Sequence, residues 1–153
     1  MKGQCLLKLM QFSEHLSGFP VGVHQTSFSA THTNIEQGPK GKDDLSYWTN
    51  FVYRFFSPNG VFRHSLHLTD NEDNGDKQYE IAFPAIPRYF HTHFESGVKN
   101  MQLIMDRGIT DRPLPGDCHF IENSKASLVY WFETGSHVRH SVMNYACSSA
   151  NVS

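Results

Sequence analysis

Histidine offers the widest choice of chemistry in this sequence, which contains ten of them. Several histidines can bind one metal ion only if their spacing brings them to the same side of an element. His91 and His93 are two residues apart in an expected helix and would point about 200° apart around its axis. Two other pairs are three residues apart in expected strands and would face opposite sides of a sheet: His64 with His67, and His137 with His140. We therefore expect no bound metal ion.

Acid–base catalysis is the alternative chemistry that these residues leave open. Some isomerases and dehydratases hold an Asp or a His in an apolar pocket inside a cone-shaped sheet. His64 and His140 lie on otherwise apolar strand faces and could point into such a cavity. However, the spacing places no acidic partner beside them, and the sequence has no glycine-rich phosphate loop and no nucleophile elbow. A binding module without catalysis or cofactor is the leading hypothesis; a small cone-fold enzyme (isomerase- or dehydratase-like) or small-ligand binder is the alternative.

Composition restricts the classes of partner. The 153 residues suffice for one domain with a core, and the formal net charge of −2 gives no general reason to bind DNA or a membrane. Arg88 with Tyr89 could stack on a nucleic-acid base, but one such pair without a basic surface is a weak signal. The three cysteines form no CxxC pair, and no apolar run approaches the roughly 20 residues that cross a bilayer. We expect an intracellular protein with neither direct DNA binding nor membrane binding.

Residues 1–42 are expected to form an N-terminal helix and a flexible loop. Cys5, Leu9, Phe12 and Leu16 recur with helical spacing, so they predict one apolar helix face. The stretch that follows is rich in Ser, Thr, Gly and His and has no period, which is typical of a loop.

A second helix is expected from Asp43 or Asp44, where a carboxylate can accept hydrogen bonds from the first turn, to the turn at residues 57–60. Its predicted buried face comprises Leu45, Trp48, Val52, Phe55 and Phe56. The residues assigned to the core of the domain are Trp48, Phe55, Phe56 and Trp131.

After Gly60 the apolar period changes from that of a helix to that of strands. Residues 61–68 and 79–83 alternate around a charged turn, which predicts a β-hairpin, and a short helix begins near Pro87 and ends at Gly97. Further strands are expected at about Lys99–Asp106, Cys118–Asn123, Ala126–Glu133 and His137–Ala146. The predicted fold class is α+β: a curved antiparallel sheet with N-terminal helices and a short helix after the first hairpin.

The run from Tyr79 to Val98 resembles the LIM-domain-binding family, which includes animal LIM-domain-binding cofactors and Chip, plant SEUSS, and fungal regulators of adhesion and development. Members of that family carry a Tyr-x-Ile strand, then Ile-Pro-Arg-Tyr-Phe and a Phe-Glu-x-Gly helix end. The residues that carry the resemblance here are Tyr79, Ile81, Ile86, Pro87, Arg88, Tyr89, Phe90, Phe94, Glu95 and Gly97. The first helix looks most similar to the fungal branch.

The resemblance implies a nuclear-transport-factor-2-like cone, with residues 43–147 as the self-association domain and residues 148–153 as a tail. The function it implies is a non-catalytic transcriptional coregulator scaffold in the nucleus. Its implied partners are a second copy, a LUFS-domain or single-stranded-DNA-binding-protein-type protein, and the transcription factors that it bridges. Because the family's domain continues into further helices beyond the sheet, we expect the domain to be incomplete in this chain.

Overall fold

The computed structural model describes residues 3–17, 41–69 and 74–148, with side chains for 3–17, 41–65 and 77–137. The described helices are α1 (Gln4–Leu16), α2 (Leu45–Phe55) and α3 (Ile86–Glu95), and a 3-10 turn (Phe83–Ala85) leads into α3. The strands are β1 (Val61–Thr69), β2 (Asn74–Ala82), β3 (Val98–Ile104), β4 (Thr110–Leu114), β5 (Cys118–Phe132) and β6 (His137–Ser148). The predicted α+β class is confirmed. The expected flexible loop falls almost entirely on residues 18–40, outside the described residues.

Strand β5 organises the larger of two antiparallel sheets, while β1 and β2 form a separate hairpin. β6 pairs along both halves of β5, so β3 and β4 share its other edge: β3 beside the C-terminal half and β4 beside the N-terminal half. The sequence predicted two strands where β5 is one, because a register shift between Glu122 and Ala126 interrupts the apolar pattern. The short strand β4 was not predicted.

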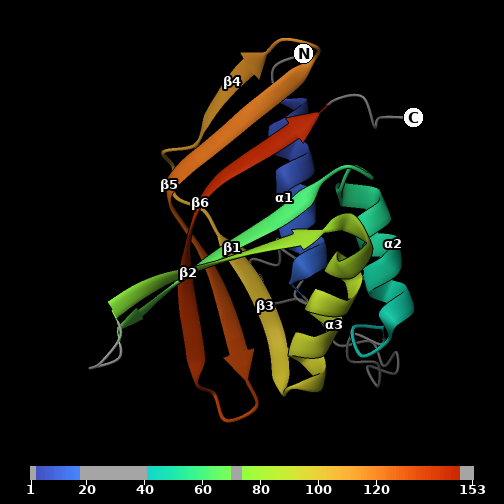
Figure 1. Ribbon diagram of the computed structural model, residues 1–153, viewed down its shortest axis with the longest axis vertical. Coiled ribbons are helices and arrows are strands. Elements are labelled where there is room, and N and C mark those ends of the chain that lie inside the picture. The colour runs from blue at the N-terminus through green and yellow to red at the C-terminus, as the bar shows by residue number, and fades with distance from the viewer. Residues whose placement is uncertain (1–2, 18–40, 70–73, 149–153) are drawn as a thin grey trace, which may run out of the picture.

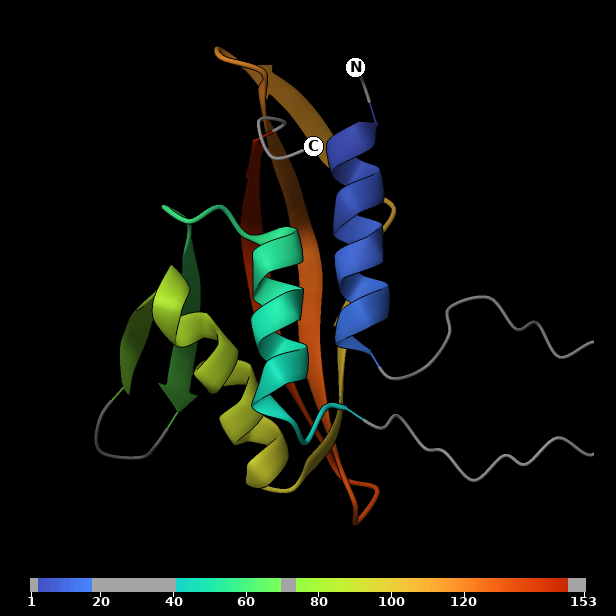
Figure 2. The ribbon, with the colours of Figure 1, turned by 90° about the vertical axis from the view of Figure 1, so that its right-hand side faces the viewer.

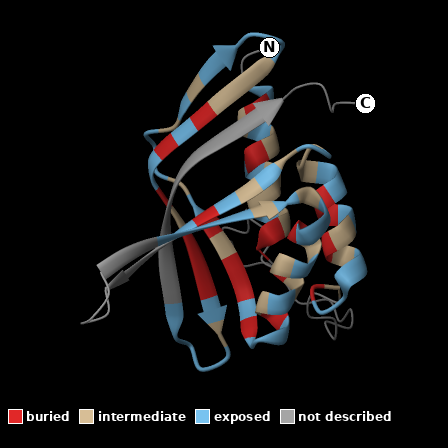
Figure 3. Ribbon diagram, viewed as in Figure 1, coloured by how far each residue is buried: buried red, intermediate tan, exposed pale blue. Residues whose placement is uncertain are grey.

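All three helices lie against one face of the four-stranded sheet (Figures 1 and 2), and the core lies between them. Figure 3 shows buried residues on the sheet and on the facing sides of the helices. The core residues from the sheet are Val98, Met101, Leu103, Ile121, Leu128 and Tyr130. Those from the helices are Cys5, Leu9, Leu16, Trp48, Phe51, Val52, Ile86, Phe90 and Phe94. No described helix is long and apolar enough to span a membrane.

Helix α2 begins as predicted, with the Asp44 carboxylate accepting a hydrogen bond from the Ser46 N–H at 2.8 Å. Its buried face differs from the prediction. Trp48 is fully buried, but Phe55 and Phe56, assigned to the core, are only half-buried. Phe51 is buried instead, because α2 packs against both α1 and α3 and therefore needs two apolar stripes.

Trp131 is not a core residue. Strand residues alternate between the two faces of a sheet, and its neighbour Tyr130 points into the core. Trp131 therefore points to the face that no described helix covers, where 37% of its surface is exposed. The apolar character of both strand faces near this position did not reveal which face the helices would occupy.

Helix α1 is attached to the rest of the chain by apolar and polar contacts. The Phe12 ring lies 5.2 Å from that of Phe51, and the Ser13 hydroxyl donates to the Leu103 carbonyl oxygen at 3.0 Å. At its C-terminal end, the Tyr47 hydroxyl donates to the His15 carbonyl oxygen and the Lys42 ammonium donates to the Leu16 carbonyl oxygen. These side chains satisfy carbonyl groups that a helix end leaves without partners.

Candidate functional site

A cluster of polar aromatic side chains joins the hairpin, α3 and the larger sheet. The Tyr89 hydroxyl and Nδ1 of His64 share a hydrogen bond of 2.9 Å. The His93 Nδ1–H donates to the Tyr89 carbonyl oxygen at 2.7 Å, which fixes the ring one helical turn away. The His93 ring also stacks on Tyr130, with 5.2 Å between centroids. This cluster occupies the place where the sequence suggested a cavity with His64.

The two tyrosine hydroxyl groups of the cluster have raised pKa values. Burial, with a further contribution from the neighbouring Tyr130, raises the pKa of Tyr89 far above its usual range. Burial also raises the pKa of Tyr130. Both hydroxyl groups thus stay neutral near neutral pH, where a general acid or base needs a pKa close to the working pH. The hydrogen bonds and ring contacts of the cluster connect β1, α3 and β5.

No carboxylate of the described residues is hydrogen-bonded to this cluster. Among the described residues, no group of three or more His, Cys, Asp and Glu side chains could hold a metal ion. His91 and His93 diverge as their spacing predicts: His91 donates to the Asp43 carbonyl oxygen at 2.9 Å, whereas His93 faces Tyr130. The side chains of His67 and His140 lie outside the described set.

A second polar pair escaped the sequence analysis. The His119 Nδ1–H donates to an Asp111 carboxylate oxygen at 2.7 Å, and both side chains are largely buried. The two residues lie on adjacent strands, β5 and β4, diagonally across the pairing. Only a prediction of β4 could have brought them together, because nothing else in the sequence signals the pair. A pair of this kind links two strands and is not by itself a catalytic site.

Half of the family-resembling residues hold α3 in place. Ile86, Phe90 and Phe94 are buried on its inner face. Pro87 stands in the first turn, where its missing N–H costs nothing, and Tyr89 belongs to the polar cluster. The run therefore specifies how one helix starts and what it packs against.

The other family-resembling residues lie farther out. Ile81 is half-buried against the core, and Gly97 ends α3 with a positive φ of 97°. Tyr79, Arg88 and Glu95 are exposed, and Arg88 makes no ion pair with any described residue. The structure does not gather these three into one site, nor does it surround Arg88 with a basic surface.

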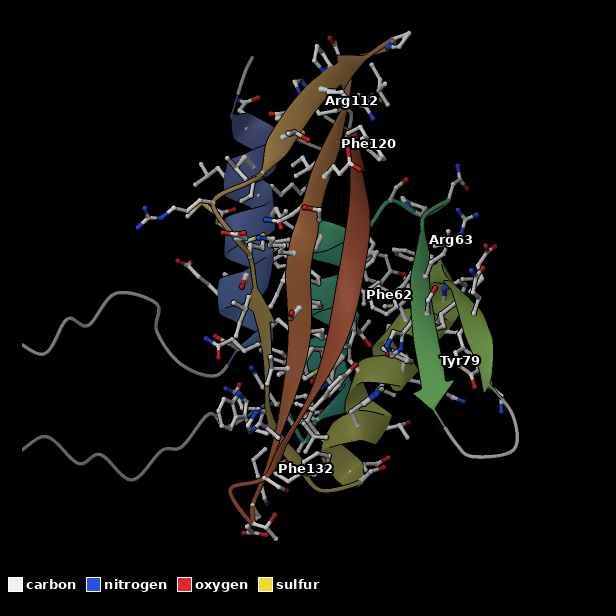
Figure 4. The ribbon with its side chains drawn as sticks, turned by 90° about the vertical axis from the view of Figure 1, so that its left-hand side faces the viewer. Phe62, Arg63, Tyr79, Arg112, Phe120 and Phe132 are labelled. Carbon is white, nitrogen blue, oxygen red and sulfur yellow. The ribbon has the colours of Figure 1, made fainter. Side chains whose placement is uncertain are left out.

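No described helix covers the sheet face opposite α1, α2 and α3; we call it the helix-free face (Figure 4). Trp131 and Ile104 lie on it with 37% and 38% of their surfaces exposed. Toward the other end of the sheet the Arg112 guanidinium lies 5.0 Å from the centre of the Phe120 ring. Large exposed apolar side chains on an uncovered sheet are typical of a protein-binding surface.

The fold defines an α+β domain that carries a polar aromatic cluster and one sheet face without a described helix on it. Residues 7–146 match the LIM-domain binding protein family, and the chain belongs to that family. The chain is 36% identical over 136 residues to the transcriptional activator ptaB of Aspergillus fumigatus, covering 89% of this chain and 16% of ptaB. It is 29% identical over 136 residues to Adhesion defective protein 1 of Schizosaccharomyces pombe, covering 89% of this chain and 30% of that protein.

An animal relative matches a shorter stretch. The chain is 34% identical over 71 residues to human LIM domain-binding protein 2, which covers 46% of this chain and 18% of that protein. The chain thus spans less than a third of the length of these fungal and animal relatives. The fungal relatives extend the match to most of the chain, in agreement with the resemblance of the first helix to the fungal branch.

Proposed function

We propose that this chain is the self-association and partner-binding domain of a non-catalytic transcriptional coregulator scaffold that acts in the nucleus. Membership of the LIM-domain-binding family and the name of the relative ptaB, a transcriptional activator, support a role in transcription. The neutral tyrosines of the polar cluster support binding over catalysis. The proposal treats residues 43–147 as the association domain, with the sheet and helices forming a nuclear-transport-factor-2-like cone.

The observation that carries the proposal is the helix-free face. A monomeric protein exposes few large contiguous apolar patches, and larger ones mark interfaces. Trp131 is suited to such an interface because tryptophan is enriched among residues that dominate binding energy. Its ring lies 5.0 Å from that of His137, which limits its freedom before a partner arrives. A preorganised aromatic anchor loses less conformational entropy on binding.

The proposed occupants of this scaffold are proteins. A second copy associates through the helix-free face, and a LUFS-domain or single-stranded-DNA-binding-protein-type partner binds the resulting assembly. The assembly bridges transcription factors, among them LIM-domain proteins, as the name of the human relative suggests. The net charge of −2 agrees with recruitment through other proteins and not through direct DNA contact.

Trp131→Arg tests the proposal by placing a charge on the helix-free face, near the C-terminal end of β5. A buried unpaired charge at an interface is strongly unfavourable, so the variant should sediment as a monomer at tens of micromolar where the unmodified chain associates. Ile104→Arg, on the same face, should have the same effect and guards against a folding defect at one position. Circular dichroism checks that both variants remain folded.

Tyr53→Arg is the matched control, because Tyr53 is 69% exposed on α2, away from the sheet. This variant should associate like the unmodified chain. The proposal is wrong if the unmodified chain stays monomeric, or if Trp131→Arg and Ile104→Arg both associate normally.

A further inference from the structure

Helix α1 packs on a surface that offers it both aromatic rings and hydrogen-bonding groups. We call this surface the α1 site; it is formed by Lys42, Tyr47, Phe51, Phe55 and Leu103. The Phe12 ring packs on the rings of Phe51 and Phe55, at 5.2 and 5.7 Å. Three hydrogen bonds from three separate elements then fix the register of the helix. The α1 site therefore recognises one partner, a helix with the sequence of α1.

The connection between α1 and its site is much longer than the docked arrangement needs. Lys42 bonds directly to Leu16, so the two ends of the connection meet in space. Residues 17–41 lie between them, and a chain of that length can extend over roughly 80 Å. A connection of that length is long enough for α1 to reach the α1 site of a neighbouring molecule.

The docked state also carries a cost that undocking relieves. Lys42 is only 5% exposed, and its ammonium contacts a carbonyl oxygen and lies about 6 Å from the rings of Tyr47 and Phe94. Desolvation lowers the pKa of Lys42 to about 8, which shows that its charged form is disfavoured there. When α1 leaves, water hydrates the Lys42 ammonium again. This favourable hydration partly offsets the loss of the contacts between α1 and its site.

We infer that α1 exchanges between copies: when two chains associate, the α1 of each docks on the α1 site of the other. The contacts are the same within one chain and between two, so the balance depends on effective concentration. In an isolated chain the tether keeps its own α1 at an effective concentration on the order of millimolar, so docking within the chain dominates. Association through the helix-free face, on which this inference rests, holds a second α1 site on the other side of the two joined sheets, at a distance that the 25 residues 17–41 can span. Exchange then becomes competitive.

Crosslinking between different chains tests the exchange. His15 of α1 is half-buried at the edge of the α1 site, 5.5 Å from the Phe55 ring, and its Nε2 lies 3.1 Å from a guanidinium nitrogen of the exposed Arg54, so cysteines at these two positions report docking. One tagged full-length chain carries His15→Cys and an untagged chain carries Arg54→Cys, with Cys118 and Cys147 replaced by serine and the buried Cys5 replaced by alanine in both. The two are mixed, allowed to equilibrate and treated with a short bis-maleimide. We expect a covalent pair of one tagged and one untagged chain.

A chain with both substitutions, crosslinked at high dilution, shows the yield for docking within one molecule. Leu7→Cys in place of His15→Cys is the matched control, because Leu7 is exposed on α1 two turns away. Its mixed crosslink should be several-fold weaker. If the chains associate but give no mixed crosslink above this control, exchange is wrong and the proposed function stands. If the mixture stays monomeric and uncrosslinked, both are wrong.

Discussion

Lys42 is the residue whose position the sequence explains least. It was assigned to a flexible loop, yet its side chain is buried and holds the C-terminal end of α1. No carboxylate of the described residues pairs with it, and its own carbonyl oxygen accepts a hydrogen bond from the Trp48 indole at 2.8 Å. A buried charge without an opposite charge is unfavourable. The Lys42 ammonium is stabilised there because it donates to a carbonyl oxygen at the C-terminal end of α1, where the helix dipole is negative.

The free energy of unfolding should depend on the protonation of Lys42. Its pKa falls from 10.5 to about 8 in the folded chain and returns to its usual value on unfolding. Between these values the unfolded state binds more protons than the folded state, so stability rises with pH, by about 1–3 kcal/mol in total. Urea unfolding at a series of pH values from about 7 to 10 measures the rise.

Lys42→Met should flatten this rise, whereas Lys99→Met, at an exposed lysine, should keep it. Above about pH 10 the slope should reverse, because burial raises the pKa of Tyr47, Tyr89 and Tyr130 and the folded state then holds protons that the unfolded state releases. An equal rise in Lys42→Met would show that another group is responsible.

At the scale of elements, the end of α3 depends on one backbone conformation. Gly97 has φ of 97°, and its N–H donates to the Phe94 carbonyl oxygen at 3.2 Å. A methyl group there would meet no atom within 4 Å, so any cost of Gly97→Ala is backbone strain alone. We expect a loss of about 1–2 kcal/mol, measured by thermal unfolding.

Gly108→Ala is the control for this loss. Gly108 also has open space around it, but its φ is outside the left-handed range. The substitution should leave stability unchanged or slightly higher, because it reduces the freedom of the unfolded chain. Equal effects of the two substitutions would mean that the helix end tolerates an ordinary residue at Gly97.

The elements were more predictable than their packing. The start of α2 at Asp44 and the end of α3 at Gly97 follow from local capping chemistry, which acts within a few residues. By contrast, the burial of Phe51 and the exposure of Trp131 depend on which surfaces meet, and local pattern does not contain that information. The His119–Asp111 pair was missed for the same reason, since it exists only through strand pairing.

At the scale of the whole molecule, the helices divide the sheet into two environments. One face holds the core, and the other exposes Trp131 and Ile104. The family-resembling run follows this division, because its buried members face the core and its exposed members point away from it. The run therefore maintains the fold that presents the helix-free face, and it does not form that face.

The hairpin has a consequence for local unfolding. Within the described chain, the backbones of β1 and β2 pair only with each other, whereas β5 is paired along both edges. Side-chain contacts such as Phe62 with Phe90, at 5.5 Å, hold the hairpin against α3. Opening it breaks no backbone pairing with the sheet, so amide deuterium exchange should be faster at residues 61–65 than at residues 126–132.

Mass spectrometry of peptic fragments measures both segments in one experiment, and equal protection would show that hairpin and sheet open as one unit.

If the hairpin opens first, Tyr79 and Ile81 move away from α3 while Phe90 remains buried in the core. The open state would then present a second apolar surface, formed by Tyr89 and Phe90 once Phe62 withdraws from their rings.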